Sequence, residues 1–192
     1  MAAKIFEKRW LRRRGEGFLR DVGVDRGQFV LDFGCGEGKY AIPAARIAGR
    51  RGRIYAVDKD RKKLSGLMRA VRKKRLGNVV PVHTANGQGI PVRTRSIDLV
   101  LLYDVLHRGY LPEESQRAAT LRGIYRTLKP GGVLSCYPTH LKKYGMTFER
   151  VLKEVRRAGF RLEGERRRAL LHDGKVVRGR VFRFVKPRGK RA

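Results

Sequence analysis

Short apolar runs and amphipathic segments alternate along the 192 residues of the chain. In this alternation the apolar runs predict strands, and the helices would cover both faces of the sheet that they form. The predicted strands are 28–33, 53–58, 79–84, 97–103, 132–137, 160–170 and 177–186. Because helical patterns lie between most of these runs, we expect an α/β domain with a mostly parallel sheet.

Four helices are predicted from apolar residues that recur at helical spacing. Their ranges are 41–48, 61–75, 112–128 and 148–159. In 61–75 the apolar positions recur at i, i+3, i+4 and i+7 from Leu64, so one face should pack on the sheet. Thr147 precedes the last helix and is a good N-cap residue.

The last two strands are joined by the sequence His172-Asp173-Gly174-Lys175. An Asp-Gly pair between two strand-like runs is a strong signal for a tight hairpin. A hairpin reverses the chain, so we expect six parallel strands and an antiparallel last strand.

No linker or repeat interrupts this order, so we interpret 1–192 as a single domain. Its apolar content of 41% is enough for a substantial core. We divide the chain into a basic N-terminal segment (1–27), a cofactor-binding core (28–137), and a C-terminal helix with a closing hairpin (138–192).

A glycine-rich turn follows the first strand, which contains Asp32, and its glycines stand at 34, 36 and 38. Glycine accepts positive φ and lets a ligand approach the backbone closely. In a dinucleotide-binding turn the third glycine would stand at 39, where this chain has Lys39, so the turn suits a ligand without a pyrophosphate. The second strand ends in Asp58, as a strand that supplies a carboxylate to a ribose diol would.

Four blocks in this order resemble the class I S-adenosylmethionine-dependent methyltransferases, especially the branch called methyltransferase type 11. The blocks are 30–38, 54–58, 97–107 and 128–134. The resemblance implies S-adenosylmethionine as the cofactor. It also implies a Rossmann-like three-layer sandwich with a seven-stranded, mostly parallel sheet whose last strand is antiparallel.

The resemblance further implies which residues contact the cofactor. These are Asp32, Gly34, Cys35, Gly36, Gly38, Asp58, Lys59, Asn86, Gly87 and Tyr103. Asp32 would orient the cofactor's amino group or the turn itself, Asp58 would accept from two ribose hydroxyls, and Lys59 would pack beside the adenine. Asn86 stands where the family often has an Asp that accepts a hydrogen bond from the adenine amino group. The amide oxygen of Asn86 can accept the same bond. The pair Asn86-Gly87 is equally typical of a turn.

Asp104 and His107 follow the fourth strand, where the family presents its substrate. Methyl transfer requires an aligned nucleophile and, for a protonated acceptor, a base. His107 has a suitable intrinsic pKa, although the equivalent histidine in this branch often has a structural role. Asp104 is better placed to position the substrate or the cofactor. The chain has no Asn-Pro-Pro-Tyr-like motif and no paired cysteines, which disfavours two types of base methylation in RNA.

Basic residues exceed acidic residues by 47 to 17, a formal charge of +30. The chain contains few Asn, Gln, Met and Cys residues, which is compatible with thermal adaptation through ion-pair networks. However, 17 acidic residues cannot neutralise 47 basic residues. We therefore expect RNA or another polyanion as a partner. The basic clusters are 8–14, 61–75, and Arg166 to Arg168 with Arg178, Arg180 and Arg183. Among the nearby aromatics Trp10, Phe6 and Tyr110, the first two are predicted to be buried.

Cys35 and Cys136 are too few for a disulfide framework and lack metal-ligand spacing, so we expect no metal site. Cys35 is interpreted as a small residue that fills the turn. No apolar run is long enough to cross a bilayer and no secretory signal is evident, so we expect a cytoplasmic protein without membrane contact. The sequence does not indicate an oligomeric state.

Three functions are consistent with these features. The first is a methyltransferase acting on RNA or a ribonucleoprotein-associated substrate. The second is a methyltransferase of the same fold acting on a small metabolite, for which the block from Asp104 to His107 is most typical. The third is a non-catalytic RNA-binding module that keeps the methyltransferase fold.

Overall fold

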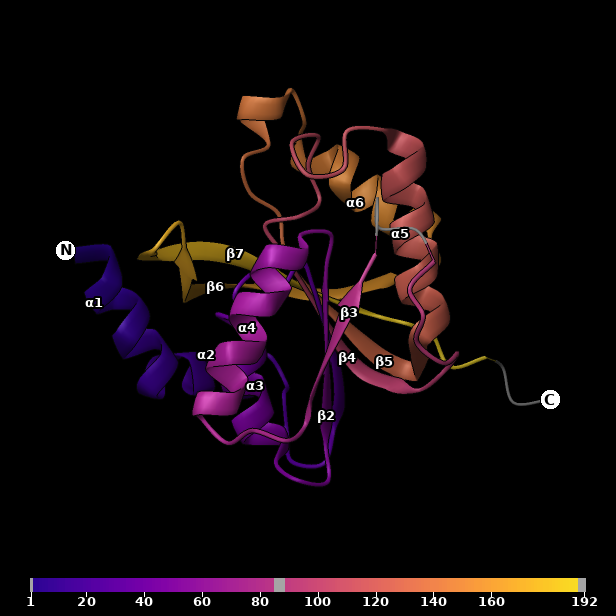
Figure 1. The fold of residues 1–192 in the computed structure, drawn as a ribbon. Helices are drawn as coiled ribbons and strands as arrows, with labels where there is room; N and C mark the ends of the chain where they lie inside the picture. Colours follow the sequence, from indigo (N-terminus) through magenta and orange to yellow (C-terminus); the bar gives the residue numbers. More distant parts are fainter. Residues whose placement is uncertain (1, 85–88, 190–192) are drawn as a thin grey trace.

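A computed structural model describes residues 2–84 and 89–189 of the chain. Its centre is a seven-stranded sheet in the order β3-β2-β1-β4-β5-β7-β6 (Figure 1). The strands are β1 (Phe29–Phe33), β2 (Arg53–Asp58), β3 (Val79–His83), β4 (Ile97–Tyr103), β5 (Leu128–Tyr137), β6 (Arg161–His172) and β7 (Lys175–Val185). All seven predicted strands are therefore present, with β5 beginning earlier than expected.

The strand directions confirm the predicted topology. Neighbouring strands from β1 to β5 pair in parallel, whereas β7 is antiparallel to both β5 and β6. Since β6 is reversed twice relative to β5, it points the same way as β1 to β5. The turn between β6 and β7 consists of Asp173 and Gly174, with φ values of 46° and 73°. Positive φ at both central residues is the geometry that tight hairpins favour.

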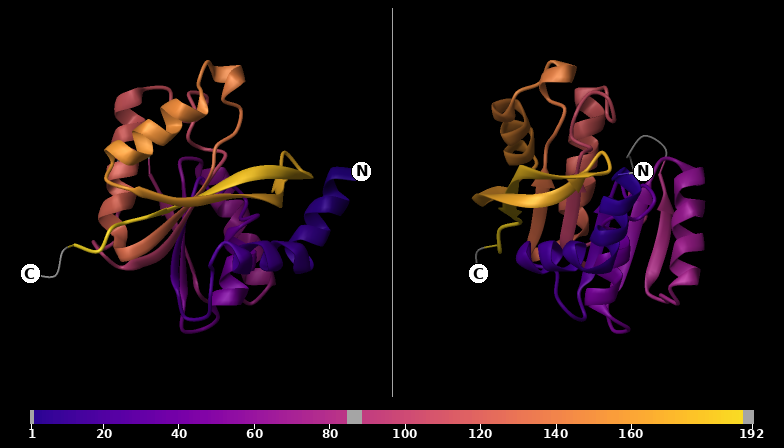
Figure 2. Two further views of the ribbon diagram at one scale, coloured as in Figure 1. Left: turned by 180° about the vertical axis from the view of Figure 1, so that it is seen from behind. Right: turned by 90° about the vertical axis from the view of Figure 1, so that its left-hand side faces the viewer.

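Helices cover both faces of the sheet, which confirms the three-layer sandwich (Figure 2). The helices are α1 (Ala2–Arg9), α2 (Gly15–Asp21), α3 (Ala41–Ala48), α4 (Arg61–Lys73), α5 (Glu114–Thr127) and α6 (Phe148–Arg157). The core that contains α2, α3 and α4 lies on one face, and the core that contains α5 and α6 lies on the other. No helix in the described residues is long and apolar enough to cross a membrane.

The N-terminal segment, for which the sequence analysis assigned no element, is a continuous helical run. A π-helical turn, η1 (Trp10–Arg14), joins α1 to α2. Trp10 is only 1% exposed, and its indole nitrogen donates to the carbonyl of Lys39 at 2.8 Å. Burial of Trp10 agrees with the expectation, but Phe6 is 37% exposed, so its predicted burial is wrong. The reason is that the run is anchored by Trp10 and by Phe18 and Leu19 of α2, while α1 projects beyond the core.

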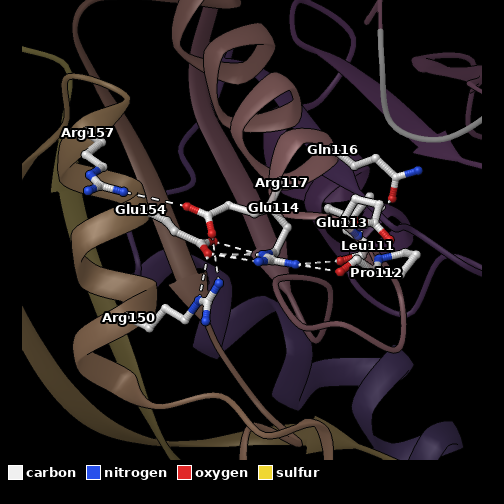
Figure 3. A network of polar contacts seen from close by, with 9 residues as sticks. All are labelled: Leu111, Pro112, Glu113, Glu114, Gln116, Arg117, Arg150, Glu154 and Arg157. Atoms are coloured by element: carbon white, nitrogen blue, oxygen red, sulfur yellow. Dashed lines mark hydrogen bonds and ion pairs between the residues drawn. The ribbon is translucent and has the colours of Figure 1, made fainter.

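A buried ion pair connects α5 to α6 (Figure 3). Arg117 is 1% exposed, and its guanidinium donates to both carboxylate oxygens of Glu154 at 2.9 to 3.2 Å. The same guanidinium donates to the carbonyls of Leu111 and Pro112 at 2.9 and 3.0 Å. Arg117 thus fixes the two helices and the segment that leads from β4 to α5. Arg150 approaches Glu154 from the more exposed side at 3.4 Å.

We expect Arg117→Ala to lower the free energy of unfolding by about 3–5 kcal/mol, because Glu154 would keep a buried charge without its partner. Urea denaturation of the purified variants measures this. Replacing both partners, Arg117→Met with Glu154→Leu, should recover most of the loss. Arg150→Ala is the control and should cost less than about 1 kcal/mol, since its side chain is 38% exposed. Equal losses for Arg117→Ala and Arg150→Ala would contradict the structural role of the buried pair.

Candidate active site

The polar residues with catalytic potential collect at one edge of the sheet, where β1, β2, β4, β5 and β6 end. A cavity of about 280 Å³ lies at this edge. Its lining includes six residues predicted from the sequence: Asp32, Gly34, Cys35, Gly36, Tyr103 and Asp104. It also includes Tyr40, Tyr137, His172 and Asp173, which the sequence analysis did not assign to the site. Carboxyl ends of parallel strands are the usual ligand site of open α/β sheets.

The three glycines of the turn have positive φ values of 79°, 53° and 85° but different surroundings. A Cβ on Gly36 would meet no atom within 4 Å, so this backbone borders open space. A Cβ on Gly34 would come within 2.3 Å of Val105, and one on Gly38 within 2.3 Å of Leu67. Gly38 does not line the cavity. Gly38 is therefore explained by its packing against α4, and Gly36 is the glycine that leaves room for a ligand.

Asp58 holds the glycine turn in shape. One carboxylate oxygen accepts from the amide of Gly36 at 2.7 Å, and the other accepts from the amide of Asp60 at 2.9 Å. Asp58 is 3% exposed and lies directly behind the turn, outside the lining of the cavity. Each carboxylate oxygen can accept a further hydrogen bond, so the proposed contact with ribose hydroxyls remains compatible with these two.

Asp32 is a buried carboxyl with an unused acceptor. One of its oxygens, Oδ2, has no hydrogen-bond partner among the residues that the structure describes. Burial, reinforced by the nearby charge of Asp58, raises the pKa of Asp32 to about 7. A buried acceptor without a donor is costly, so this oxygen is suited to a cationic or N–H group of a ligand.

Lys59, another predicted cofactor residue, is held by a structural partner. Lys59 donates to the carbonyl of Tyr110 at 3.0 Å and lies 4.3 Å from the centre of its ring. This contact connects the end of β2 to the segment after β4.

Asn86 and Gly87 lie outside the described residues, so their assignment stays a prediction.

Cys35 and Tyr103 have packing roles in the site rather than reactive ones. Cys35 is buried, and burial raises the pKa of its thiol far above the ordinary value. The hydroxyl of Tyr103 lies 2.6 Å from that of Ser135, and its ring packs edge-on against Tyr40 at 4.9 Å. The hydroxyl of Tyr40 donates to the carbonyl of Leu171 at 2.6 Å, which ties the start of α3 to the end of β6.

His107 is held by its own loop. Its Nδ1 accepts from the amide of Gly109 at 3.1 Å, and its Nε2 lies 3.2 Å from the carbonyl of Asp104. The ring stacks on Tyr144 with an interplanar angle of 3°. Burial lowers the pKa of His107, although Asp104 acts in the opposite direction. With both nitrogens engaged and no place in the cavity lining, this geometry favours the structural role over the catalytic one.

Asp104 is the centre of a cluster that the sequence analysis missed. His172 Nδ1 lies 3.3 Å from Asp104 Oδ2, and His140 Nε2 lies 3.4 Å from Asp104 Oδ1. Thr139 donates a short hydrogen bond to the same carboxylate. Partial burial opposes ionisation of Asp104, but the contacts with His172 and Thr139 outweigh it and lower its pKa. The contact with Asp104 raises the pKa of His172 against the effect of burial.

The signal for these histidines was present in the chain. His172 is the last residue of β6, and His140 follows the end of β5 by three residues. The rule that pointed to Asp104, namely its place at a strand's carboxyl end, applies equally to both. Both histidines, however, lie outside the four motif blocks of the family resemblance.

Comparison with known proteins agrees with this geometry. Residues 30–132 match the family described as "Methyltransferase domain". A demethylmenaquinone methyltransferase of Geobacillus kaustophilus is 30% identical over 140 residues, which cover 72% of this chain and 56% of the relative. One from Listeria welshimeri is 33% identical over 121 residues, which cover 63% of this chain and 49% of the relative. The chain spans about half the length of these curated relatives.

Solved structures share the fold across nearly the whole chain. An S-adenosylmethionine-dependent methyltransferase from Aquifex aeolicus aligns with a TM-score of 0.73 and 21% identity, covering 96% of this chain and 99% of that one. A TehB-like enzyme from Corynebacterium glutamicum aligns with a TM-score of 0.69 and 20% identity, covering 96% and 97%. With the matched domain spanning more than half of its residues, the chain belongs to the class I S-adenosylmethionine-dependent methyltransferases, and its cofactor is S-adenosylmethionine.

Proposed function

We propose that the protein transfers a methyl group from S-adenosylmethionine to a small organic acceptor that carries an ionisable proton. The observation that carries this proposal is that the cofactor cavity adjoins a second groove, with His172 lining both. Asp32 and Gly36 line one part of the cofactor cavity, and Asp104 and His172 line another. His172 also lines a neighbouring groove of about 420 Å³, together with His140.

The residues around the glycine turn fit the cofactor. Gly36 leaves space that a side chain would fill, and the unpartnered oxygen of Asp32 would accept from the amino group of the methionine part. Asp58 would accept from the ribose hydroxyls while it keeps its bonds to the turn. When bound, S-adenosylmethionine supplies a methyl group activated by a positively charged sulfur.

The groove on the other side suits an acceptor with an apolar body. Tyr137, Pro138, Leu141 and Phe148 line it, and Lys142, Lys143 and Arg180 contribute cations. An acceptor seated there would meet His140 and His172 at the border between the groove and the cavity. His172 would take the acceptor's proton, and the carboxylate of Asp104 would stabilise the resulting imidazolium. Proton removal at this position exposes the acceptor's electron pair to the methyl group.

The relatives also support a small acceptor. Those compared above are named as demethylmenaquinone methyltransferases. Their names point to a small organic substrate rather than to RNA.

RNA is retained as a second candidate substrate because one basic cluster has no acidic partners. All eight cations of the segment 61–75 are exposed, and the ion pairs among the described residues include none of them. One of the eight, Lys63, also lines the cofactor cavity. By contrast, Arg180 and Arg183 pair with Glu165 and Glu163 at 2.6 and 2.9 Å, so the C-terminal cluster is partly neutralised.

Asp32→Asn should stabilise the cofactor-free protein at pH 8 and weaken its affinity for S-adenosylmethionine. The folded-state pKa of about 7 exceeds the ordinary 3.8, so the wild type loses stability as the pH rises from about 4 to 7. The asparagine variant avoids this loss, on the order of a few kcal/mol. Thermal unfolding at pH 5 and pH 8 measures the difference, and calorimetric titration measures the affinity. A variant that is no more stable at pH 8, or that binds equally well, would contradict this role.

Asp58→Ala should weaken binding of S-adenosylmethionine by about 1.5–3 kcal/mol, the range for hydrogen bonds to a charged group. Calorimetric titration of the folded variant gives this value. Asp60→Ala is the matched control, because the Asp60 carboxylate caps α4 through the amides of Lys62 and Lys63, whereas Asp58 bonds to the glycine turn. Equal affinity for wild type and Asp58→Ala would remove Asp58 from the cofactor site.

The substrate class is tested by transfer of labelled methyl groups to total RNA and to a metabolite extract. We expect label in the small-molecule fraction alone. A parallel titration measures RNA affinity between 50 and 200 mM salt for the wild type and for Arg72→Gln with Lys73→Gln. Label in RNA, with an affinity that falls about a thousandfold over this range and weakens in the variant, would establish the RNA candidate instead. Arg178→Gln, on the C-terminal cluster, is the control for a general loss of charge.

A further inference from the structure

Four potential metal ligands converge beside the cofactor cavity. They are Asp104 from the segment after β4, His140 from the segment after β5, and His172 with Asp173 from the hairpin between β6 and β7. One nitrogen or oxygen atom from each of the four lies within 4.8 Å of those from the others. The four donors thus come from three separate segments of the chain.

The distances within this cluster suit ligands of a shared cation better than direct hydrogen bonds. His172 Nδ1 lies 3.3 Å from Asp104, and His140 Nε2 lies 3.4 Å from Asp104 and 3.6 Å from Asp173. Direct N–H···O bonds are shorter, at about 2.7–3.2 Å. Ligands at about 2.0–2.1 Å from a tetrahedral Zn²⁺ are separated by about 3.3–3.4 Å, which matches the distances from His172 and His140 to Asp104. The distance from His140 to Asp173 is slightly longer.

The backbone and the neighbouring side chains also support a built site. Asp104 and His140 have φ values of 59° and 54°. Such left-handed conformations cost free energy in residues other than glycine and tend to concentrate at functional sites. Thr139 donates to the Asp104 carboxylate, as residues behind a metal ligand commonly do to orient it.

We propose that Asp104, His140, His172 and Asp173 form a binding site for a divalent transition-metal ion such as Zn²⁺. Two imidazoles and two carboxylates suit such an ion, and the two carboxylates would balance its charge. The spacing of the cysteines indicated no metal site, whereas the four proposed ligands include no cysteine and are distributed from residue 104 to residue 173.

The role of the ion rests on the proposed methyl transfer. Bound at the border of the acceptor groove, the ion would take the acceptor's oxygen as a fifth ligand and lower its pKa. The acceptor's proton would leave to water, and the oxygen's electron pair would form the new bond to the methyl carbon. The bond between that carbon and sulfur would break with its electrons, leaving S-adenosylhomocysteine. In the metal-loaded protein the ion would therefore replace His172 in promoting loss of the proton.

The test is a Zn²⁺ titration of the full chain after treatment with a chelator, followed by titration with Co²⁺. We expect the wild type to bind one ion per chain and Co²⁺ to give the intense visible absorption of a four-coordinate site. His140→Ala with His172→Ala should bind Zn²⁺ at least about a hundredfold more weakly. His83→Ala is the matched control, because His83 is the one histidine of four that lies away from Asp104, and it should bind like the wild type.

Calorimetric titration with S-adenosylmethionine and circular dichroism establish that each variant is folded. Equal Zn²⁺ affinity in the wild type and the double variant, or an equal loss in His83→Ala, would overturn the site and leave the cluster as a proton network. Methyl transfer at the same rate with and without the ion would overturn its role in catalysis while the proposed function stands. Tight Zn²⁺ binding without transfer to any acceptor would leave the metal site standing and refute the proposed function.

Discussion

The common direction of six strands is the constraint on which the site depends. A parallel sheet places every carboxyl end at one edge, so the residues there meet although they are distant in sequence. The antiparallel strand β7 lies between β5 and β6 and thereby returns β6 to the shared direction. If β6 ran the other way, His172 would lie at the opposite edge, away from Asp32 and Asp104.

The buried carboxylates at this edge of the sheet favour the binding of a cation. Asp32 and Asp58 are both buried, and the charge of Asp58 disfavours ionisation of Asp32. Asp58 offsets part of this cost through the amides of Gly36 and Asp60, whereas one oxygen of Asp32 has no such donor among the described residues. The cofactor-free fold therefore carries an unfavourable interaction that a positively charged ligand would relieve. The arrangement thus lowers the stability of the cofactor-free protein and favours binding of the ligand.

Most of the fold could be predicted because periodicity, the glycine turn and the Asp-Gly hairpin are local signals. The N-terminal helical run was missed, since its many charged residues obscure the few that are deeply buried, among them Trp10 and Leu19. Within the site, motif matching found Asp32 and Asp104 but not His140 or His172. Their roles depend on strand ends that meet only in three dimensions. His107 was assigned from its position near a motif, which does not reveal that its own loop occupies both ring nitrogens.

The two outer strands of the sheet differ in how they are protected from pairing with other chains. On β3, Pro81 removes an amide that a new strand would need. On β6, Arg166 and Arg167 are exposed along the free edge. Charges at such an edge discourage the addition of another strand. Part of the basic surplus thus acts against aggregation, and this protection weakens as salt screens the arginines.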